Sequence, residues 1–427
     1  MRPGLSSSVR PSHPINPWPS KLGLRSAART VIGLLVAAFA AGPALAAGVK
    51  AYVGNFKDNT VSVIDTTAGN VLTTLVVAAG PDGIAITPNG ATVFVSGSNS
   101  SSLSVIDAAT DQLSAAIEVG KGPQGLAMSP DGRLLLVAVN GDDRVAFVDP
   151  TTRSIIGTTP LSKPHTIAIR PDGKVAYVAA QEPGHFALVA IDLVTRAVLS
   201  TTPLEKTPRD LEFGFDGKAL YFTLAGVGAV QVLDPASNKV VAQIGTGVSP
   251  HMASYFSGTS VGVVVVQGPG ELALFNPATN APIRAIAVGK QPHWVDAIDA
   301  THMLVSNEGS NTVTVVDLAT DKTSTIAVGN APRKVAVQRV TAKIGAQVSI
   351  ANFAFEPAPI TIAAGQSITW TNNDGAPHGL QFKDGATGMD LMLPGQTFSR
   401  RYLKPGVYDY VCAVHPYMTA RVTVTAP

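Results

Sequence analysis

Short apolar runs alternate with turn-forming residues through most of the chain. Between residues 50 and 340 these runs are about five to seven residues long, rich in Val, Ile, Ala and Leu, and separated by Gly, Pro, Asn and Asp. Runs of this length and composition predict β-strands joined by tight turns. Asn-Gly and Asp-Gly pairs at 89–90, 131–132, 172–173 and 216–217 predict hairpins. The pattern therefore predicts an all-β fold.

The strand pattern is repeated seven times, with a period of roughly 42 residues. In each copy an acid or its amide closes one apolar run: Asp65, Asp107, Asp149, Asp192, Asp234, Asn276 and Asp317. A proline opens another run with the same period: Pro81, Pro123, Pro164, Pro208, Pro250, Pro292 and Pro332. Four short strands in about 42 residues is the period of a β-propeller blade. Residues 47–340 are therefore predicted to form a seven-bladed β-propeller.

The two ends of the repeat region complement each other. Lys50–Phe56 aligns with the second strand of later copies, so the first copy lacks its innermost strand. Lys334–Arg339 has the sequence of an innermost strand but has no second strand after it. We expect these two segments to pair and to close the ring. A short linker, Val340–Gly345, then leads to a second predicted domain, 346–427.

The second domain contains the only cysteine of the chain. Cys412, His415 and Met418 are spaced three residues apart after a strand-like run, and His378 lies in a predicted turn between two others. A thiolate, two imidazoles and a thioether are the ligand set of a blue-copper electron-transfer site. A catalytic thiol is a weaker interpretation, because nothing near Cys412 suggests an oxyanion hole or an orienting carboxylate.

Two segments of this domain resemble the cupredoxin family. The first segment is TWTNNDGAPHGLQF (369–382) and the second is YDYVCAVHPYM (408–418). They resemble the WTNxDxxPH and YDYxCxxHPxM segments of the plastocyanin-type branch to which amicyanin and pseudoazurin belong. The resemblance covers 346–427 and implies a Greek-key β-sandwich that holds one type 1 copper ion. The ligands that it implies are His378, Cys412, His415 and Met418.

The same resemblance implies roles for residues near the ligands. Asn372 is expected to hydrogen-bond across the two ligand loops and to hold them in register. Gly379 departs from the family pattern, because a larger residue is usual after the first histidine. An apolar rim around the exposed edge of His415 is expected to receive a transient redox partner. The residues of this rim are Ala376, Pro377, Pro416 and Tyr417.

The repeats resemble YVTN-type propellers through Tyr52–Asn55 and Tyr177–Ala180. The residue after each marker proline is expected on the rim of the central channel: Asp82, Gln124, His165, Arg209, His251, His293 and Arg333. The three histidines converging on one rim are a candidate metal or haem site, since haem-d nitrite reductases use paired histidines on a propeller. The interpretation that these histidines are solvated residues of the channel rim is favoured over a metal or haem site.

The first 46 residues differ from the rest of the chain. They carry five basic residues and no acid, followed by the apolar run Val31–Ala41 and the small-x-small sequence Ala44–Ala46. This pattern predicts a Sec-type signal peptide and a periplasmic or secreted mature protein. A retained membrane anchor is an alternative, although the apolar run is too short to span a bilayer as a helix.

Charge and cysteine content exclude several classes of function. Without the predicted signal peptide the chain has 26 basic and 29 acidic residues. This balance gives no reason to expect nucleic acid or an anionic membrane as a partner. A single cysteine excludes a disulfide framework and a C-x-x-C-H haem attachment.

We expect an electron carrier that exchanges single electrons with redox protein partners, with the propeller as their docking platform. One alternative is an oxidoreductase with a metal or haem at the channel rim and the cupredoxin as its relay. Another is a non-redox propeller that binds a ligand. Strand direction favours the carrier, because Lys334–Arg339 should deliver the linker to the face away from the histidines. A relay would then require a head-to-tail dimer, whereas a monomer is expected.

Overall fold

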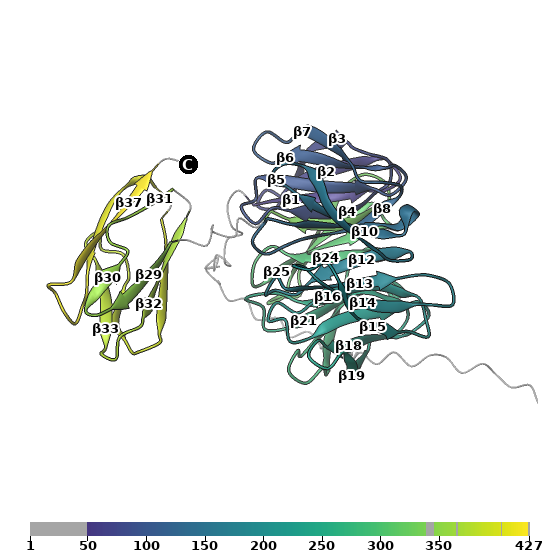
Figure 1. The fold of residues 1–427 in the computed structure, drawn as a ribbon. Coiled ribbons are helices and arrows are strands. Elements are labelled where there is room, and N and C mark those ends of the chain that lie inside the picture. The colour runs from purple at the N-terminus through teal and green to yellow at the C-terminus, as the bar shows by residue number, and fades with distance from the viewer. Residues whose placement is uncertain (1–48, 339–345, 364–365, 403, 426–427) are drawn as a thin grey trace, which may run out of the picture. The chain divides into compact units, whose positions relative to one another are not determined.

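The protein consists of two compact units of β-structure (Figure 1). The structure, a computed structural model, describes residues 49–338, 346–363, 366–402 and 404–425. The first unit ends at Gln338, and the second contains the described residues from 346 onward. The predicted signal peptide, 1–46, and the linker Val340–Gly345 lie outside the described residues. Among those described, every named element is a strand except the short 3-10 helix η1 (Asn140–Asp142), which confirms the all-β prediction.

The first unit is a ring of seven four-stranded antiparallel sheets. From the innermost strand outward, the first sheet consists of β28 (Pro332–Val337), β1 (Lys50–Asn55), β2 (Thr60–Asp65) and β3 (Asn70–Val76). The second sheet consists of β4 (Pro81–Ile86), β5 (Thr92–Gly97), β6 (Ser102–Asp107) and β7 (Gln112–Glu118). The third sheet consists of β8 (Pro123–Met128), β9 (Leu135–Val139), β10 (Arg144–Asp149) and β11 (Ser154–Pro160).

The other four sheets have the same order. The fourth sheet consists of β12 (Pro164–Ile169), β13 (Val175–Ala180), β14 (Ala187–Asp192) and β15 (Val198–Pro203), and the fifth of β16 (Pro208–Phe213), β17 (Leu220–Leu224), β18 (Ala229–Asp234) and β19 (Lys239–Gly245). The sixth sheet consists of β20 (Pro250–Tyr255), β21 (Gly262–Val266), β22 (Glu271–Phe275) and β23 (Pro282–Ala287). The seventh consists of β24 (Pro292–Ala297), β25 (His302–Asn307), β26 (Thr312–Asp317) and β27 (Thr323–Ala327).

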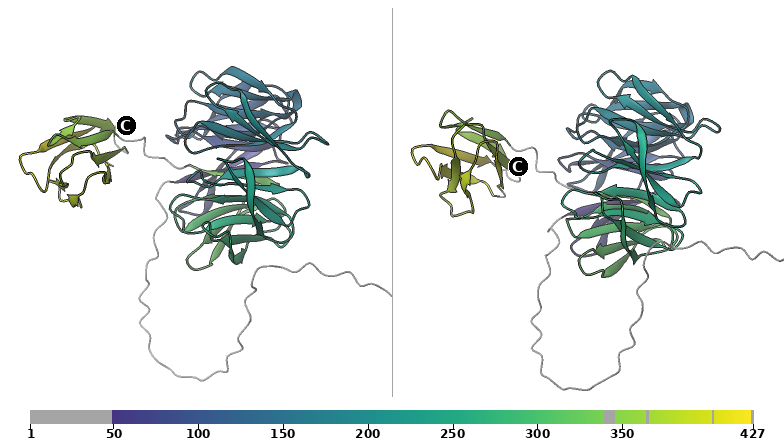
Figure 2. Two further views of the ribbon diagram at one scale, coloured as in Figure 1. Left: turned by 60° about the horizontal axis from the view of Figure 1, so that its bottom comes forward. Right: turned by 90° about the horizontal axis from the view of Figure 1, so that it is seen from below.

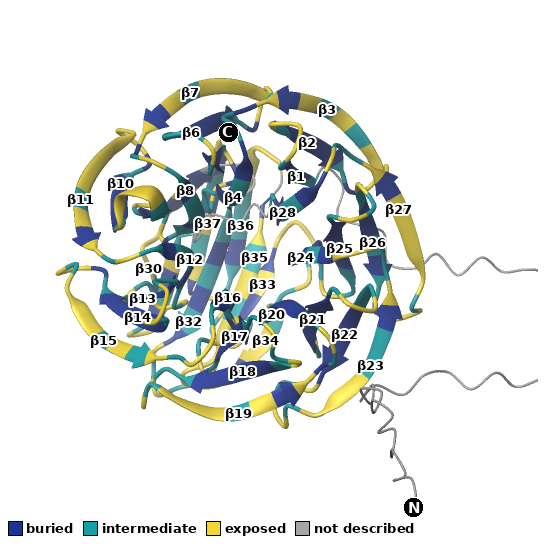
Figure 3. Cartoon of the chain, turned by 90° about the vertical axis from the view of Figure 1, so that its right-hand side faces the viewer, coloured by how far each residue is buried: buried dark blue, intermediate teal, exposed yellow. Residues whose placement is uncertain are grey.

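The middle strands of each blade are buried and the outermost strand is exposed, as the distribution of apolar residues along the chain predicts. The two middle strands are apolar on both faces and almost wholly buried between neighbouring blades, as in β5 and β6. The outermost strands, such as β7, alternate and are mostly exposed. Figure 3 shows these exposed outer strands around the circumference and the innermost strands around the centre. The core is thus a set of apolar layers between adjacent blades.

The ring closes as the sequence predicts, with β28 pairing antiparallel to β1. Its register places Ala51 opposite Val337 and Val53 opposite Val335. The bounds differ from the prediction, because all seven innermost strands begin at their marker proline rather than after it. Proline is tolerated there because the first residue of a strand can lack a ladder hydrogen bond. In most blades the register shifts within the next three residues, as between Pro81 and Ile84.

The acid that marks each repeat stabilises the turn between the two outer strands. In all seven blades its side-chain Oδ1 accepts a hydrogen bond of 2.7–2.9 Å from the amide N–H two residues later. Asn276 makes the same bond as the six aspartates. An Asx turn needs only one side-chain oxygen, so the repeat retains an acid or its amide.

The second unit contains a four-stranded and a five-stranded sheet. Figure 2 shows the ribbon of this unit, in green to yellow, in two further views. One sheet consists of β30 (Ala354–Glu356), β29 (Gln347–Ala351), β32 (Ser367–Asn372) and β35 (Thr397–Arg401). The other consists of β31 (Ile360–Ala363), β37 (Thr419–Thr425), β36 (Gly406–Val411), β33 (His378–Phe382) and β34 (Met389–Met392). Trp370 and Tyr410 are fully buried between the sheets, with ring centroids 5.3 Å apart.

Neither unit contains, within the described residues, a helix with the length and apolar character needed to cross a membrane.

Candidate metal centre

Two loops at one end of the second unit carry the predicted ligands. His378 is the first residue of β33, so it lies at the start of a strand and not in the preceding turn. Cys412 follows β36, and Met418 immediately precedes β37. Backbone hydrogen bonds close this second loop, because Cys412 N–H donates to Met418 O and Met418 N–H donates to His415 O, both at 2.9 Å. The three-residue spacing therefore forms a compact turn.

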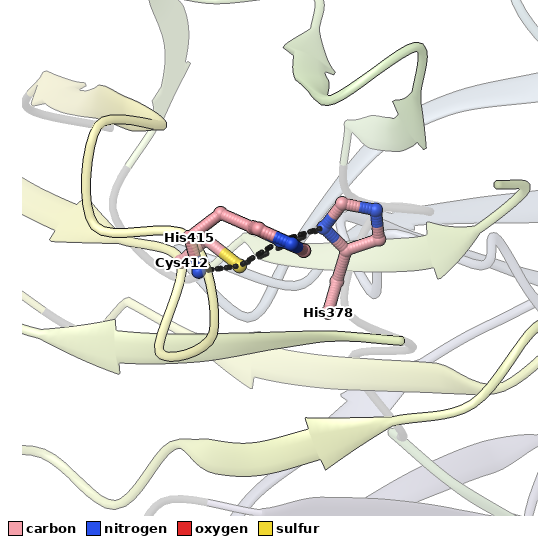
Figure 4. Close-up of side chains that lie close together, drawn as sticks. All are labelled: His378, Cys412 and His415. Carbon is pink, nitrogen blue, oxygen red and sulfur yellow. Dashed lines mark hydrogen bonds between the residues drawn. The ribbon is translucent and has the colours of Figure 1, made fainter. Parts of the chain in front are cut away.

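The side chains of His378, Cys412 and His415 converge on one point (Figure 4). Cys412 Sγ lies 3.6 Å from His378 Nδ1 and 3.9 Å from His415 Nδ1, and the two Nδ1 atoms are 3.3 Å apart. Cys412 and His378 are completely buried, whereas His415 is partly exposed. Met418 is buried in the same apolar core as Cys412.

These distances fit three ligands around a single ion. Typical metal bonds of about 2.0–2.1 Å to nitrogen and 2.3 Å to sulfur give a trigonal set with edges of roughly 3.5 Å and 3.8 Å. The observed nitrogen–nitrogen distance is 3.3 Å, and the nitrogen–sulfur distances are 3.6 Å and 3.9 Å. Soft sulfur combined with imidazole nitrogen suits copper. The donor atoms therefore fit a trigonal copper site.

Asp374 orients the His378 ring and was not identified from the sequence. His378 Nε2 lies 2.8 Å from Asp374 Oδ2. A proton held on Nε2 by this carboxylate leaves the lone pair on Nδ1, which faces Cys412. Hydrogen bonds from the Phe353 amide first, and also from the Asn352 amide and the His378 ring, hold the pKa of Asp374 below its usual range. The available signal was a carboxylate four residues before the histidine.

Phe353 is a second residue that sequence reasoning missed. Asn352 and Phe353 form the two-residue turn between β29 and β30, with φ angles of 51° and 57°. Their amides donate to the two oxygens of Asp374, at 2.7 Å and 2.9 Å. The Phe353 ring then lies edge-on to both imidazoles, 5.0 Å from His415 and 5.4 Å from His378 between centroids. One carboxylate thus orients a ligand and fixes the turn that carries this ring.

Asn372 supports one ligand loop rather than linking two. Its Nδ2 donates hydrogen bonds to Ala376 O at 2.9 Å and to Met392 O at 2.8 Å. Its Oδ1 accepts a hydrogen bond from the Asp374 amide N–H at 3.0 Å. These bonds fix the His378 loop against the end of β34. The predicted bridge from Asn372 to the Cys412 loop is therefore wrong, because the hydrogen bonds of its side chain all go to its own loop and to β34.

The unusual Gly379 has a steric cause. A Cβ at this position would lie 2.4 Å from Asp390 O and 2.8 Å from Ala413 Cβ. The close approach of β34 and of the Cys412 loop leaves no space for a side chain. The departure from the family pattern thus reflects local packing of the same two loops that hold the ligands.

The predicted apolar rim is largely exposed. Tyr417 is 71% exposed, Pro377 and Pro416 are exposed, and Ala376 is half-buried. The Tyr417 ring lies 6.0 Å from the His415 ring, and the 44% exposed Phe353 flanks the same imidazole.

The three predicted channel histidines line one cavity of about 1100 Å³ in the propeller. His251 and His293 are adjacent, with ring centroids 4.0 Å apart. His165 lines the same cavity, but the three do not bring one ligand atom each to a common point. Among the described residues, the group of three His, Cys, Asp or Glu that does so is His378, Cys412 and His415.

Comparisons with known proteins identify the second unit. Residues 342–425 match the model of the plastocyanin/azurin family of copper binding proteins. Amicyanin-alpha of Methylorubrum extorquens is 38% identical over 84 residues, which are 18% of this chain and 70% of that protein. Plastocyanin of Scenedesmus fuscus is 34% identical over 97 residues, 20% of this chain and 97% of that protein. Amicyanin of Paracoccus versutus is 33% identical over 82 residues, which are 18% of this chain and 62% of that protein.

Solved structures resemble a larger part of the chain. Hydrazine synthase of Kuenenia stuttgartiensis superposes with a TM-score of 0.58 at 20% identity, over 67% of this chain and 99% of that chain. A functionally unknown protein from Desulfotomaculum acetoxidans gives a TM-score of 0.59 at 14% identity, over 67% and 98%. At these identities the likeness shows the fold alone, and it agrees with the propeller.

Copper is the cofactor of the matched family, and the His-Cys-His cluster lies within the matched residues. Through its C-terminal domain, the chain belongs to the plastocyanin/azurin family of copper-binding proteins.

Proposed function

We propose that the mature chain is an exported type 1 copper protein that carries single electrons between redox proteins. His378, Cys412 and His415 would hold one copper ion, with Met418 as a weaker fourth ligand. The observation that carries this proposal is the triangle of Sγ and two Nδ1 atoms, with edges of 3.3, 3.6 and 3.9 Å. When bound, copper supplies a one-electron redox couple.

The surrounding residues favour transfer without rearrangement. Asp374 fixes the tautomer of His378, Asn372 fixes the loop before it, and the backbone bonds of the Cys412 loop fix the thiol. A ligand set held in this way changes little between two oxidation states, so little energy is spent on moving side chains. Burial of Cys412 keeps water from its sulfur, while the exposed edge of His415 gives a partner access.

Reversible one-electron chemistry is the test of this function. Protein of residues 47–427, loaded with one equivalent of Cu(II), should accept one electron per chain and return it to an oxidant over repeated cycles. Cys412→Ser should lose this capacity, whereas His185→Gln, a histidine exposed on the propeller, should keep it. Irreversible reduction, or equal behaviour of both variants, would contradict the proposal.

The partner-docking surface proposed for the second unit consists of Ala376, Pro377, Pro416 and Tyr417, together with Phe353. Its support is the exposure of these apolar side chains around the partly exposed His415. Weak redox encounters use small surfaces of this kind. Tyr417→Lys should slow electron exchange with a physiological partner and leave the optical spectrum intact, and an unchanged rate would place docking elsewhere.

Export to the periplasm or the cell exterior, and the role of the propeller as a platform for redox partners, are part of the same proposal. They are supported by the composition of residues 1–46 and by the fusion of a propeller to an electron-transfer domain. A monomer is expected, and the mass in solution tests this. A relay enzyme would instead show copper reduction that collapses when His165, His251 and His293 are replaced by alanine.

A further inference from the structure

The innermost strands of five consecutive blades bring basic side chains to one cavity. β12, β16, β20, β24 and β28 surround the centre of the ring (Figure 3). Each contributes the residue after its marker proline to the lining of the cavity: His165, Arg209, His251, His293 and Arg333. We propose that this cavity binds a small anion through carboxylate or inorganic oxyanion oxygens, with Arg209 as the ionic anchor and the three histidines as neutral hydrogen-bonding partners.

Arg209 is the arginine of this group without an ion pair among the described residues. Its half-buried guanidinium donates to Ser249 Oγ at 2.9 Å and to Gln267 Oε1 at 3.3 Å, both neutral acceptors. Arg333 differs, since it contacts Asp82 Oδ1 at 3.0 Å and Glu308 Oε1 at 3.3 Å. Glu308 and Asp210 act on the charge of Arg209, but neither forms an ion pair with its guanidinium. An anion in the cavity would give this partly buried cation a direct charged partner.

The histidines have unused hydrogen-bonding atoms at the same place. Nδ1 of His165, of His251 and of His293 is buried and has no hydrogen-bond partner in the protein. His251 is only 9% exposed, and its ring lies 4.0 Å from that of His293. Buried polar atoms are rarely left without a partner, so three around one cavity, on β12, β20 and β24, indicate a ligand or ordered solvent.

The charges around the histidines favour an anion over a metal ion. Burial first, and then Arg209, His165 and Arg333, lower the pKa of His251 to about 3. Burial likewise lowers the pKa of His165 and of His293. The imidazoles are therefore neutral near pH 7 and can donate N–H groups to an anion. A metal ion would not find three ligand atoms together among the described residues of this cavity.

The acids of the lining do not cancel this preference. Asp82 and Glu308 both form ion pairs with Arg333. Asp58 accepts hydrogen bonds from the backbone amide and the side chain of Asn330. Burial raises the pKa of Asp210 well above its usual range, which favours its neutral form. Four basic residues line the cavity, namely Lys57, Arg209, Arg333 and Lys334. With Asp210 neutral they outnumber the three ionised acids of the lining, Asp58, Asp82 and Glu308, by one.

Calorimetry of the copper-loaded mature protein tests the proposal. Sodium phosphate and sodium acetate are titrated at low ionic strength, with sodium chloride as the reference. At least one of the two oxyanions should bind at a single saturable site. Phosphate binding without acetate binding identifies an inorganic oxyanion site, and tighter acetate binding identifies a carboxylate site. No saturable binding of either anion would overturn the proposal.

Variants locate the site. Arg209→Gln should weaken binding by about tenfold or more, because a hydrogen bond to a charged group is lost. Arg153→Gln removes an exposed arginine outside the cavity and should have no effect. His293→Gln provides an independent variant if Arg209→Gln does not fold, and it should also weaken binding. Equal weakening by Arg153→Gln, or a second metal ion that His251→Gln abolishes, would overturn the assignment.

Discussion

Asp374 links two features of the copper site that are distant in the sequence. It accepts from the amides of Asn352 and Phe353 and contacts Nε2 of His378. The orientation of a ligand and the position of the aromatic ring beside it thus depend on one carboxylate. Groups that orient metal ligands in this way commonly contribute 10–100-fold to metal affinity.

Replacement of this carboxylate should weaken copper binding. Asp374→Ala removes the partner of Nε2 and the acceptor for the 352–353 turn, so we expect roughly 10–100-fold weaker Cu(II) affinity in competition with a chelator. Asp409→Ala is a matched control, because it removes a carboxylate of the same domain that pairs with Arg421. Equal affinities of the two variants would show that Asp374 does not position His378.

Met418 should set the reduction potential rather than retain the metal. In blue-copper sites the axial ligand is weak, and its identity tunes the potential. Met418→Gln should therefore keep one copper and lower the potential, because a harder oxygen ligand favours the oxidised ion. Protein-film voltammetry of both proteins measures this change, and an unchanged potential would mean that Met418 is not the axial ligand.

Ligand identities followed from the sequence because a short loop carries three of them in fixed spacing. The roles of Asp374 and Phe353 did not, because they depend on a turn about 20 residues upstream folding against the His378 loop. Asn372 shows the same difficulty. Its presence near the site was predictable, but its partners, Ala376 and Met392, depend on how β34 packs.

The turns between the outer strands explain why one acid recurs in every blade. Asp192 illustrates this, since its Oδ1 accepts hydrogen bonds from the backbone amides of Val194 at 2.9 Å and Thr195 at 2.7 Å. The period of these turns predicted the number of blades and most strand positions. It could not predict that the innermost strands start at the proline, because this depends on the register shift that follows.

An Asx turn can be tested with a substitution that the protein itself already uses. Asp192→Ala should lower the thermal midpoint of the propeller, because two backbone amides lose their acceptor. Asp192→Asn should retain most of the stability, since Asn276 makes the same bond in another blade. Calorimetric scans of both variants provide the comparison, and equal losses would show that charge matters more than the hydrogen bond.

The propeller as a whole should lose stability in mild acid. The pKa of His251 is lowered to about 3 from 6.5, so the unfolded chain takes up a proton below pH 6.5 while the folded chain does not. Its contribution to the free energy of unfolding is therefore complete above pH 6.5 and is lost as the pH falls. From pH 6.5 to 5 this loss is roughly 2 kcal/mol for one such histidine.

Removal of this histidine should flatten the pH dependence. Urea unfolding at pH 7 and pH 5 should show a smaller difference in free energy for His251→Gln than for the unaltered protein. His185→Gln, which removes an exposed histidine, should not change that difference. Parallel pH dependence in all three proteins would mean that His251 does not remain neutral in the folded state.

The most direct test of a type 1 copper centre is the optical and electron paramagnetic resonance spectrum of the mature protein with one equivalent of Cu(II). The geometry of His378, Cys412 and His415 predicts one copper per chain, intense blue absorption from the Cys412 thiolate and narrow copper hyperfine splitting. Cys412→Ser should lose the blue colour. A colourless Cu(II) protein, or one in which Cys412→Ser leaves the spectrum unchanged, would contradict the assignment.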